Sequence, residues 1–285
     1  MRSWRHSVSL QRTISRILVY VLIIAGMIMF LFPLFWMIST SLKSNDQVFT
    51  YPIQWLPKPP LWHNYVEAWT EYYPFSRFLR NSLTIALGAI LGNVISVPIV
   101  SYSFARLRWP GRDFFFFLVL FTMMVPYPVV MVPQFVLFHK LGWINTYLPF
   151  IVPAFLGGSG FYIFLMRQLI MTIPRELDEA ARIDGCSTFG IYWRIILPLI
   201  KPGLVAIAIF EFIARWNDFL GPLIYLTKTD LFTLPLGLNV FRTQEGIYMN
   251  SFMAVSCVSI IPSMVLFFVA QKYFIQGIVI TGLKG

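Results

Sequence analysis

Charged residues are scarce in this chain of 285 residues: Asp, Glu, Lys and Arg make up 12%, against 58% hydrophobic residues. Soluble globular domains carry about 25% charged residues, because they need polar surface to face water. A soluble globular protein is therefore excluded, and lipid must solvate most of the surface. The net charge of +10 does not indicate nucleic-acid binding, since the basic residues flank apolar runs instead of forming one patch.

The residues that usually carry chemistry are also few. The two cysteines, Cys186 and Cys257, lie in a polar loop and in an apolar run, so we expect no structural disulfide. The three histidines are scattered, and no cluster has the spacing of metal ligands. The sequence contains no G-x-x-x-x-G-K-[ST] phosphate loop and no evident nucleophile–base pair. We therefore expect no catalytic residues, no metal and no cofactor bound by this chain.

Long apolar runs are abundant instead. About 20 residues of helix cross the hydrocarbon core of a bilayer. Five runs lack any charged residue or histidine, and a sixth is interrupted by Glu211, Arg215 and Asp218. We predict an all-α polytopic membrane protein with six transmembrane helices, within residues 17–42, 81–105, 114–138, 141–166, 202–227 and 246–271.

The distribution of Lys and Arg predicts the orientation, because cytoplasmic loops carry the excess of these residues. Placing the N-terminus inside leaves only seven basic residues in external segments, namely Lys43, Lys58, Arg77, Arg80, Lys140, Lys228 and Arg242. All others except Arg215 are then cytoplasmic. Both termini are predicted to be cytoplasmic.

The cytoplasmic loop at residues 167–201 is predicted to form two short helices around a turn. Pro174 suits the first helical position, where a missing N–H costs nothing. Asp178 and Arg182 are four residues apart, the spacing of an ion pair along a helix. A helix this short is marginal in water and needs a surface to pack on.

Gly185 is expected to close the first helix in a left-handed conformation, and Ser187 to cap the second. One face of the first helix carries two small alanines that let another backbone approach, within the set Leu177, Ala180, Ala181 and Asp184.

A longer pattern spans this loop. Glu179-Ala180-Ala181 is followed after three residues by Gly185, and after nine more by Ile195-x-Leu197-Pro198. This is the EAA motif at its usual spacing, and the chain resembles the membrane permease subunits of binding-protein-dependent ATP-binding-cassette (ABC) importers. It is most similar to the carbohydrate branch and to the smaller maltose permease subunit. The supporting stretches are Phe104-Ala105-Arg106, Val125 to Pro133, Leu141-Gly142 with Asn145-Thr146, Trp216-Asn217-Asp218, and residues 271–285.

The resemblance implies a type I importer permease in a bacterial or archaeal cell membrane, as a single domain over residues 1–285 with its core at about 79–274. It implies a second permease subunit, two ATPase subunits that use ATP and Mg²⁺, an extracytoplasmic solute-binding protein and surrounding lipid as partners. The tail at 272–285 is expected to reach the ATPase interface. The residues expected to dock on the ATPase are Glu176, Leu177, Glu179, Ala180, Ala181, Asp184, Gly185, Ile195, Leu197 and Pro198.

The fifth span is the candidate translocation path. Charged side chains at membrane depth usually face a bundle interior or a water-filled cavity. Glu211 and Arg215 are four residues apart and can pair. We expect the path to involve Glu211, Arg215, Trp216, Asn217 and Asp218. The same Glu211–Arg215 pair is alternatively an internal polar contact between two permease subunits.

The function expected is ATP-driven import of an oligosaccharide or related polyol by alternating access. One alternative is an ion-coupled secondary transporter that uses Glu211 and Asp218 as ion sites. Such transporters often have inverted repeats, and none is visible here. A non-transporting scaffold bound by an ATPase is a third possibility.

Overall fold

The computed structural model describes residues 2–71, 73–243 and 248–282, with the side chains of residues 14–71, 73–239 and 248–271. Every regular element in this described part is helical, as predicted. The chain divides into two compact units, Met1–Tyr73 with Phe241–Ile260, and Pro74–Val240 with Ile261–Gly285. The single domain over residues 1–285 stays a prediction.

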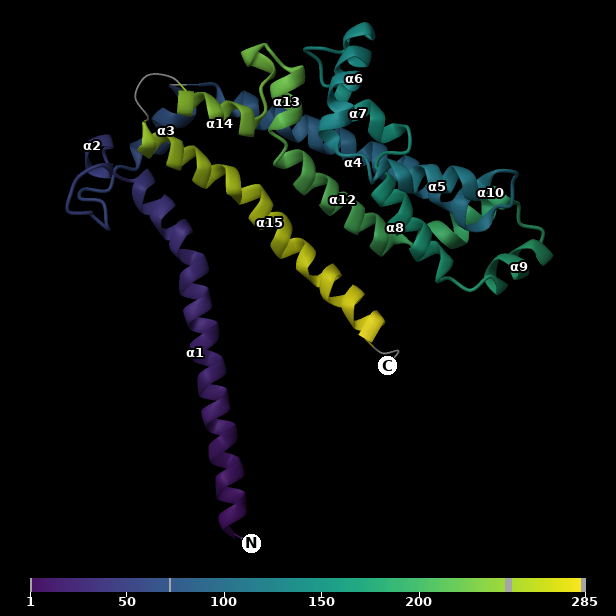
Figure 1. Ribbon diagram of the computed structural model, residues 1–285, viewed down its shortest axis with the longest axis horizontal. Coiled ribbons are helices and arrows are strands. Elements are labelled where there is room, and N and C mark those ends of the chain that lie inside the picture. Colours follow the sequence, from purple (N-terminus) through teal and green to yellow (C-terminus); the bar gives the residue numbers. More distant parts are fainter. Residues whose placement is uncertain (1, 72, 244–247, 283–285) are drawn as a thin grey trace. The chain divides into compact units, whose positions relative to one another are not determined.

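The first unit contains α1 (Arg2–Ser41), α2 (Asn45–Val48) and α3 (His63–Thr70). The helices of the second unit, drawn in Figure 1, are α4 (Phe75–Arg106), α5 (Arg112–Thr122), α6 (Tyr127–Lys140), α7 (Leu148–Phe155), α8 (Gly160–Met171), α9 (Glu176–Ile183), α10 (Thr188–Ile191), the π-helix η1 (Tyr192–Ile196), α11 (Leu197–Leu199), α12 (Lys201–Trp216), α13 (Leu220–Tyr225) and the 3-10 turn η2 (Thr229–Leu231). Both units share α14 (Leu234–Thr243) and α15 (Met249–Gly282).

In the first unit, the segment after α1 is held by contacts to backbone groups. Asn64 donates from Nδ2 to the carbonyls of Ser41 at 2.8 Å and Lys43 at 2.9 Å. The Lys43 ammonium lies 4.4 Å from the ring centroid of Trp36, a cation–π contact. Burial lowers the pKa of Lys43. The residues that flank the proline-rich stretch at 51–60 are therefore held in place, although the stretch itself forms little helix.

Helix α4 is the centre of the second unit and packs against α7, α8 and α12 (Figure 1). Small residues let these backbones approach, as is common between membrane helices. A Cβ atom at Gly92 would lie 2.9 Å from the backbone carbon of Ala154. Ser96 donates to the carbonyl of Ala154 at 2.6 Å, and Ser101 to that of Ile163 at 3.1 Å. The long helix is thus fastened along its length.

Against the six predicted spans, the described residues contain four candidate spans and two bent helix pairs, Arg112–Thr122 with Tyr127–Lys140 and Thr188–Leu199 with Lys201–Trp216. The second pair begins inside the predicted cytoplasmic loop. The four candidate spans are Ile14–Ser41, Phe75–Arg106, Leu148–Met171, which comprises α7 and α8, and Met249–Gln271. Counting each bent pair as one span gives up to six spans.

The third span is not the continuous helix predicted over residues 114–138. Helices α5 and α6 meet at 103°. The break lies at Pro126, whose backbone is extended (φ −61°, ψ 136°). Proline disfavours helical geometry in the residue before it and cannot donate its own backbone hydrogen bond.

The fourth span is shifted toward the C-terminus compared with the predicted 141–166. Its first residues form a turn in which Gly142 and Asn145 have φ angles of +70° and +59°. Asn145 accepts at Oδ1 from the backbone of Thr227 at 2.7 Å, which ties this turn to the end of α13. At the other end, α8 continues to Met171, so the first residues of the predicted loop belong to that helix.

The fifth span was predicted as one helix over residues 202–227, and this is wrong. Helix α12 ends at Trp216, and α13 begins only at Leu220. Asp218 accepts a hydrogen bond at Oδ1 from the backbone N–H of Gly221 at 3.0 Å. A short polar side chain that bonds nearby backbone competes with helical hydrogen bonds, which accounts for the break.

Candidate functional site

The predicted helix–turn–helix loop is present, and its turn is a Schellman motif. The N–H of Cys186 bonds to the carbonyl of Ala181 at 2.8 Å, and that of Gly185 to Arg182 at 3.0 Å. Gly185 has φ +77°, so the left-handed cap is confirmed. Pro174, however, lies one residue before the N-cap Arg175 and not at the first helical position.

The second half of the loop is a continuous helical run from Thr188 to Leu199. Ser187 caps it by accepting from the N–H of Gly190 at 3.2 Å, as predicted. The middle turn, Tyr192–Ile196, is a π-helix, in which the N–H of Leu197 bonds to Tyr192. Pro198 has no N–H, and its ring would clash with the carbonyl four residues back, so a widened turn just before it relieves both problems.

This second half is anchored inside the chain. Ile191, Ile196 and Ile200 are fully buried and pack with Met166 and Ile170 of α8 in the main core cluster. Helix α9 is more exposed and contributes mainly Ala181 to that cluster. The loop therefore has a fixed half and a projecting half.

The residues expected to dock differ in exposure. Ala181 is buried inside its own chain, so its small side chain serves internal packing as well. Ile195 and Leu197 are half-buried against the core. The exposed members of the set are Glu176, Leu177, Glu179, Ala180, Asp184, Gly185 and Pro198.

Asp178 does not form the predicted ion pair with Arg182; it pairs with Arg106 at the end of α4. The Arg106 Nε atom lies 3.4 Å from Asp178 Oδ2, and the side chains are only 3% and 8% exposed. Arg106 also donates to the carbonyl of Ile173 at 2.7 Å. One buried guanidinium thus joins α4, the end of α8 and α9.

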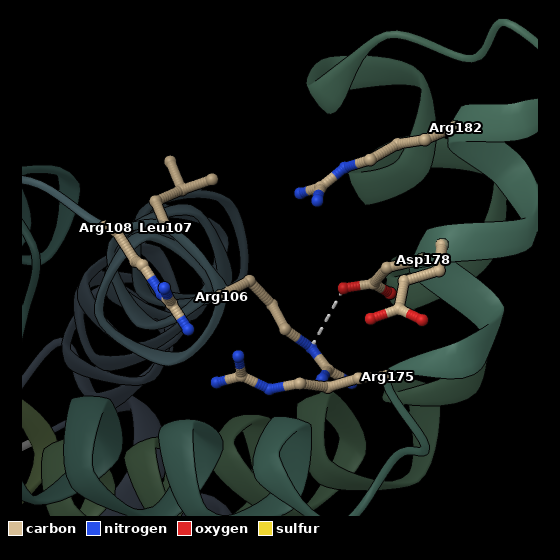
Figure 2. Close-up of a pocket in the computed structure, with 7 residues that line it drawn as sticks. Arg106, Leu107, Arg108, Arg175, Asp178 and Arg182 are labelled. Carbon is tan, nitrogen blue, oxygen red and sulfur yellow. Dashed lines mark ion pairs between the residues drawn. The ribbon is translucent and has the colours of Figure 1, made fainter.

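A pocket of about 420 Å³ lies beside this pair. We call it the α9 pocket. Its charged lining residues are Arg106, Arg108, Arg175, Asp178, Glu179 and Arg182. Four of these lie three or four positions apart, from Arg175 to Arg182, and so share one side of α9. Figure 2 shows the guanidinium groups of Arg108 and Arg182 entering from opposite sides.

On α12, the predicted pair between Glu211 and Arg215 is confirmed. Arg215 donates from Nε to Glu211 Oε1 at 2.7 Å, and its Nη1 lies 3.9 Å from Asp218 Oδ2. Glu211 is buried. Both carboxylates therefore lie near the same arginine, which pairs most closely with Glu211.

A second cavity, of about 390 Å³, opens at the break between α12 and α13. We call it the α12–α13 cavity. It is lined by Tyr127, Gln134, Phe138, Pro149, Phe150, Pro153, Arg215, Asp218, Leu220, Gly221 and Tyr225.

Of the predicted path residues, only Arg215 and Asp218 line this cavity. Glu211 is buried beneath Arg215, and Trp216 is buried and stacks on Phe212 with ring centroids 5.3 Å apart. Asn217 is exposed and donates to the carbonyl of Ile213 in its own helix at 2.8 Å. The structure therefore brings part of the predicted set together.

Sequence reasoning missed Gln134 as a cavity residue, although a signal existed. It is the sole amide side chain in the apolar run of residues 114–138, and polar groups at membrane depth tend to face cavities. The pairing of Arg106 had no such signal, because its partner is 72 positions away (178 minus 106). The side chains of the predicted tail, residues 272–285, lie outside the described part.

Residues 85–280 match the protein family described as "Binding-protein-dependent transport system inner membrane component". The arabinooligosaccharides transport system permease protein of Halalkalibacterium halodurans is 36% identical over 256 residues, covering 89% of this chain and 91% of that protein. The sn-glycerol-3-phosphate transport system permease protein of Yersinia pestis is 31% identical over 267 residues, covering 91% and 94%.

A solved structure has a similar fold. It is the crystal structure of a bacterial ABC transporter involved in the import of the acidic polysaccharide alginate. The superposed chain has a TM-score of 0.81 and 25% identity, with coverage of 92% of this chain and 96% of that chain.

Proposed function

The chain belongs to the family of binding-protein-dependent transport system inner membrane components, and on this premise we propose that it is the permease subunit that carries an oligosaccharide through the α12–α13 cavity. It is an integral protein of the inner membrane. Sequence relatives that handle arabinooligosaccharides, and a structural relative that imports alginate, support carbohydrate as the substrate class.

The observation that carries this proposal is the lining of the α12–α13 cavity. Its volume of about 390 Å³ lies within the range of about 300–1,000 Å³ usual for ligand pockets. Rings of Tyr127, Phe138 and Tyr225 offer flat faces for the C–H side of a sugar ring, and Gln134 can bond hydroxyl groups. Arg215 and Asp218 add charged hydrogen-bonding groups, which suits a polyhydroxylated ligand.

We propose further that the exposed residues of α9 dock on a separate ATPase. Leu177 is 43% exposed beside the small side chain of Ala180, so a partner backbone can approach closely. Under this proposal, two partner ATPase subunits bind ATP and Mg²⁺ and hydrolyse the nucleotide. A second permease subunit completes the path, and an extracytoplasmic binding protein delivers the solute.

The proposed route for mechanical coupling is the buried Arg106–Asp178 pair. A displacement of α9 by the ATPase would act directly on the end of α4, because this pair and the Arg106–Ile173 hydrogen bond join them. Helix α4 in turn packs against α7, α8 and α12, the last of which carries Arg215. The docking helix and the cavity are thereby connected through packed elements.

The pairing of the charges on α12 argues against ion-coupled transport. An ion site needs a carboxylate that can exchange its cation. Here Glu211 and Asp218 lie 2.7 and 3.9 Å from Arg215, so each carboxylate already has a fixed cationic neighbour that cannot be exchanged.

The test is uptake of a labelled arabino-oligosaccharide into proteoliposomes that contain the complete transporter and its binding protein, with no ion gradient. Uptake that requires ATP is the expected result. Uptake that requires an ion gradient and ignores ATP would overturn the proposal. Binding of ATPase without uptake of any carbohydrate in a panel of oligosaccharides and polyols would reject the substrate class.

A further inference from the structure

Beyond docking and transport, the α9 pocket contains three arginines, Arg108, Arg175 and Arg182, to which neither role has been assigned. Four guanidinium groups and two carboxylates line it. Asp178 is already paired with Arg106 at 3.4 Å, which leaves Arg108, Arg175 and Arg182 against Glu179 alone. Within the described residues, these three arginines form no ion pair within 4.0 Å. Like charges this close repel one another unless an anion lies between them.

The floor of the α9 pocket is formed by buried charged side chains. Arg106 is 7% exposed and Asp178 is 6% exposed. Arg106 Nε and Asp178 Oδ1 are buried without a hydrogen-bond partner. Buried polar atoms are usually satisfied by protein, water or ligand. Of these two atoms only Arg106 Nε is a donor, so the floor has one unused N–H next to the three arginines that can bond an anion.

We propose that the α9 pocket binds a phosphate group between Arg108, Arg175 and Arg182. The planar guanidinium matches phosphate oxygens with two parallel hydrogen bonds, which favours phosphate over a compact halide. Figure 2 shows Arg108 on the chain segment after α4, Arg175 and Arg182 on the α9 side, and the side chain of Arg106 between Arg175 and Arg182. The volume of about 420 Å³ accommodates a phosphate with its substituent.

Two sources supply this chemistry on the cytoplasmic side of a membrane, where the proposed function puts α9. One is the headgroup of an anionic phospholipid, since basic pockets near helix ends on this side bind such headgroups. The other is free inorganic phosphate or a phosphorylated solute. A phosphate held here would bridge the end of α4 and α9, the same two elements that the Arg106–Asp178 pair joins.

The experiment uses the complete purified transporter and two matched double variants. The pocket variant is Arg175→Gln/Arg182→Gln. The control variant is Arg194→Gln/Lys201→Gln, which removes the same charge from exposed loop positions outside the pocket lining. Retention of phosphatidylglycerol is measured by native mass spectrometry after release from mixed phosphatidylcholine and phosphatidylglycerol nanodiscs. Binding of labelled inorganic phosphate is measured in nanodiscs of phosphatidylcholine alone.

The pocket variant should bind at least about tenfold more weakly than wild type, because it loses hydrogen bonds to two charged donors. The control variant should bind as wild type does. Loss in the phosphatidylglycerol arm identifies a lipid headgroup, and loss in the phosphate arm identifies a free phosphate. Equal binding by all three proteins in both arms, or an equal loss in both variants, would overturn the proposal.

ATP-driven sugar uptake, measured on the same three preparations, separates this proposal from the proposed function. Wild type that imports sugar but retains no phosphate ligand rejects only the phosphate site. Wild type that retains a phosphate ligand but imports no carbohydrate rejects only the transport assignment.

Discussion

The α9 pocket and the α12–α13 cavity are of similar volume and both contain arginines and carboxylates, yet their charges are arranged differently. In the α12–α13 cavity, Arg215 lies within 4.0 Å of both Glu211 and Asp218, so the local charges are internally paired. In the α9 pocket, one buried pair is accompanied by three arginines that have no ion-pair partner among the described side chains. A cavity without a free cationic group suits an uncharged solute in transit, whereas a pocket with such arginines suits a bound anion or a partner surface.

The largest effect should come from breaking the one pair in the α9 pocket that is buried. Arg106→Leu should lower the free energy of unfolding by about 3–5 kcal/mol, because it leaves the charge of Asp178 buried without a partner. SDS titration of the purified subunit in mixed micelles measures this. The double variant Arg106→Leu/Asp178→Leu should recover most of the loss, since it leaves no unpaired charge. A double variant as unstable as the single one would show that packing, and not the ion pair, holds α9.

Straining the turn after α9 should have the next largest effect, and we expect it to affect ATPase docking and not the α12–α13 cavity. Gly185→Val places a β-branched residue at φ +77°, at a cost of about 1–3 kcal/mol. We expect less ATPase to copurify with the transporter. Gly142→Val is the matched control, because Gly142 also has a left-handed φ, +70°, and an open site for a Cβ atom. Equal ATPase recovery with both variants would contradict the docking role of the turn.

Trimming the exposed face of α9 should weaken docking without weakening the fold. Leu177→Ala removes a side chain that is 43% exposed in this chain. If Leu177 contacts the ATPase, its loss should cost about 1 kcal/mol or more of binding, or roughly fivefold in Kd. The control is Leu56→Ala, which trims a leucine that is 60% exposed in the predicted external segment. Reduced ATPase affinity in the control as well would indicate a non-specific effect.

The smallest predicted effect concerns the α12–α13 cavity. Gln134→Leu removes one neutral hydrogen-bonding group, which typically contributes about 0.5–1.5 kcal/mol. The KM for oligosaccharide uptake should rise about twofold to tenfold. Asn217→Ala should leave KM unchanged, because Asn217 bonds within its own helix and does not line the cavity. A raised KM for Asn217→Ala with an unchanged KM for Gln134→Leu would show that the path follows the residues predicted from the sequence.

Local features of the loop and of α12 could be predicted from the sequence because their partners are close along the chain. The left-handed Gly185, the Ser187 cap and the Glu211–Arg215 pair each involve residues within four positions. Spacing along a helix is enough to recognise such contacts. The resemblance carried by the EAA motif likewise depends on order and spacing alone.

Predictions of features that depend on tertiary packing were absent or wrong. The partner of Asp178 could not be found by helical spacing, because Arg106 lies on another helix and outcompetes the nearby Arg182. Runs of apolar residues indicated the spans but not where each helix ends, since hydropathy does not register how far a proline or a short polar side chain bends the chain. The break at residues 217–219 is the most consequential of these, because the α12–α13 cavity opens there.

The π-helical turn at Tyr192–Ile196 gives this loop a property unlike that of an ordinary helix. A π-helical turn contains one residue more than an α-helical turn, and this extra residue does not change the direction in which the following side chains point. Deleting one residue would keep the present orientation, whereas if the same residues formed plain α-helix, everything beyond the turn would be rotated by about 100° relative to what precedes it. Ile200 would turn away from the core that it now fills. The π-helical hydrogen bonding of this one turn therefore determines which side of α12 is presented to the rest of the protein.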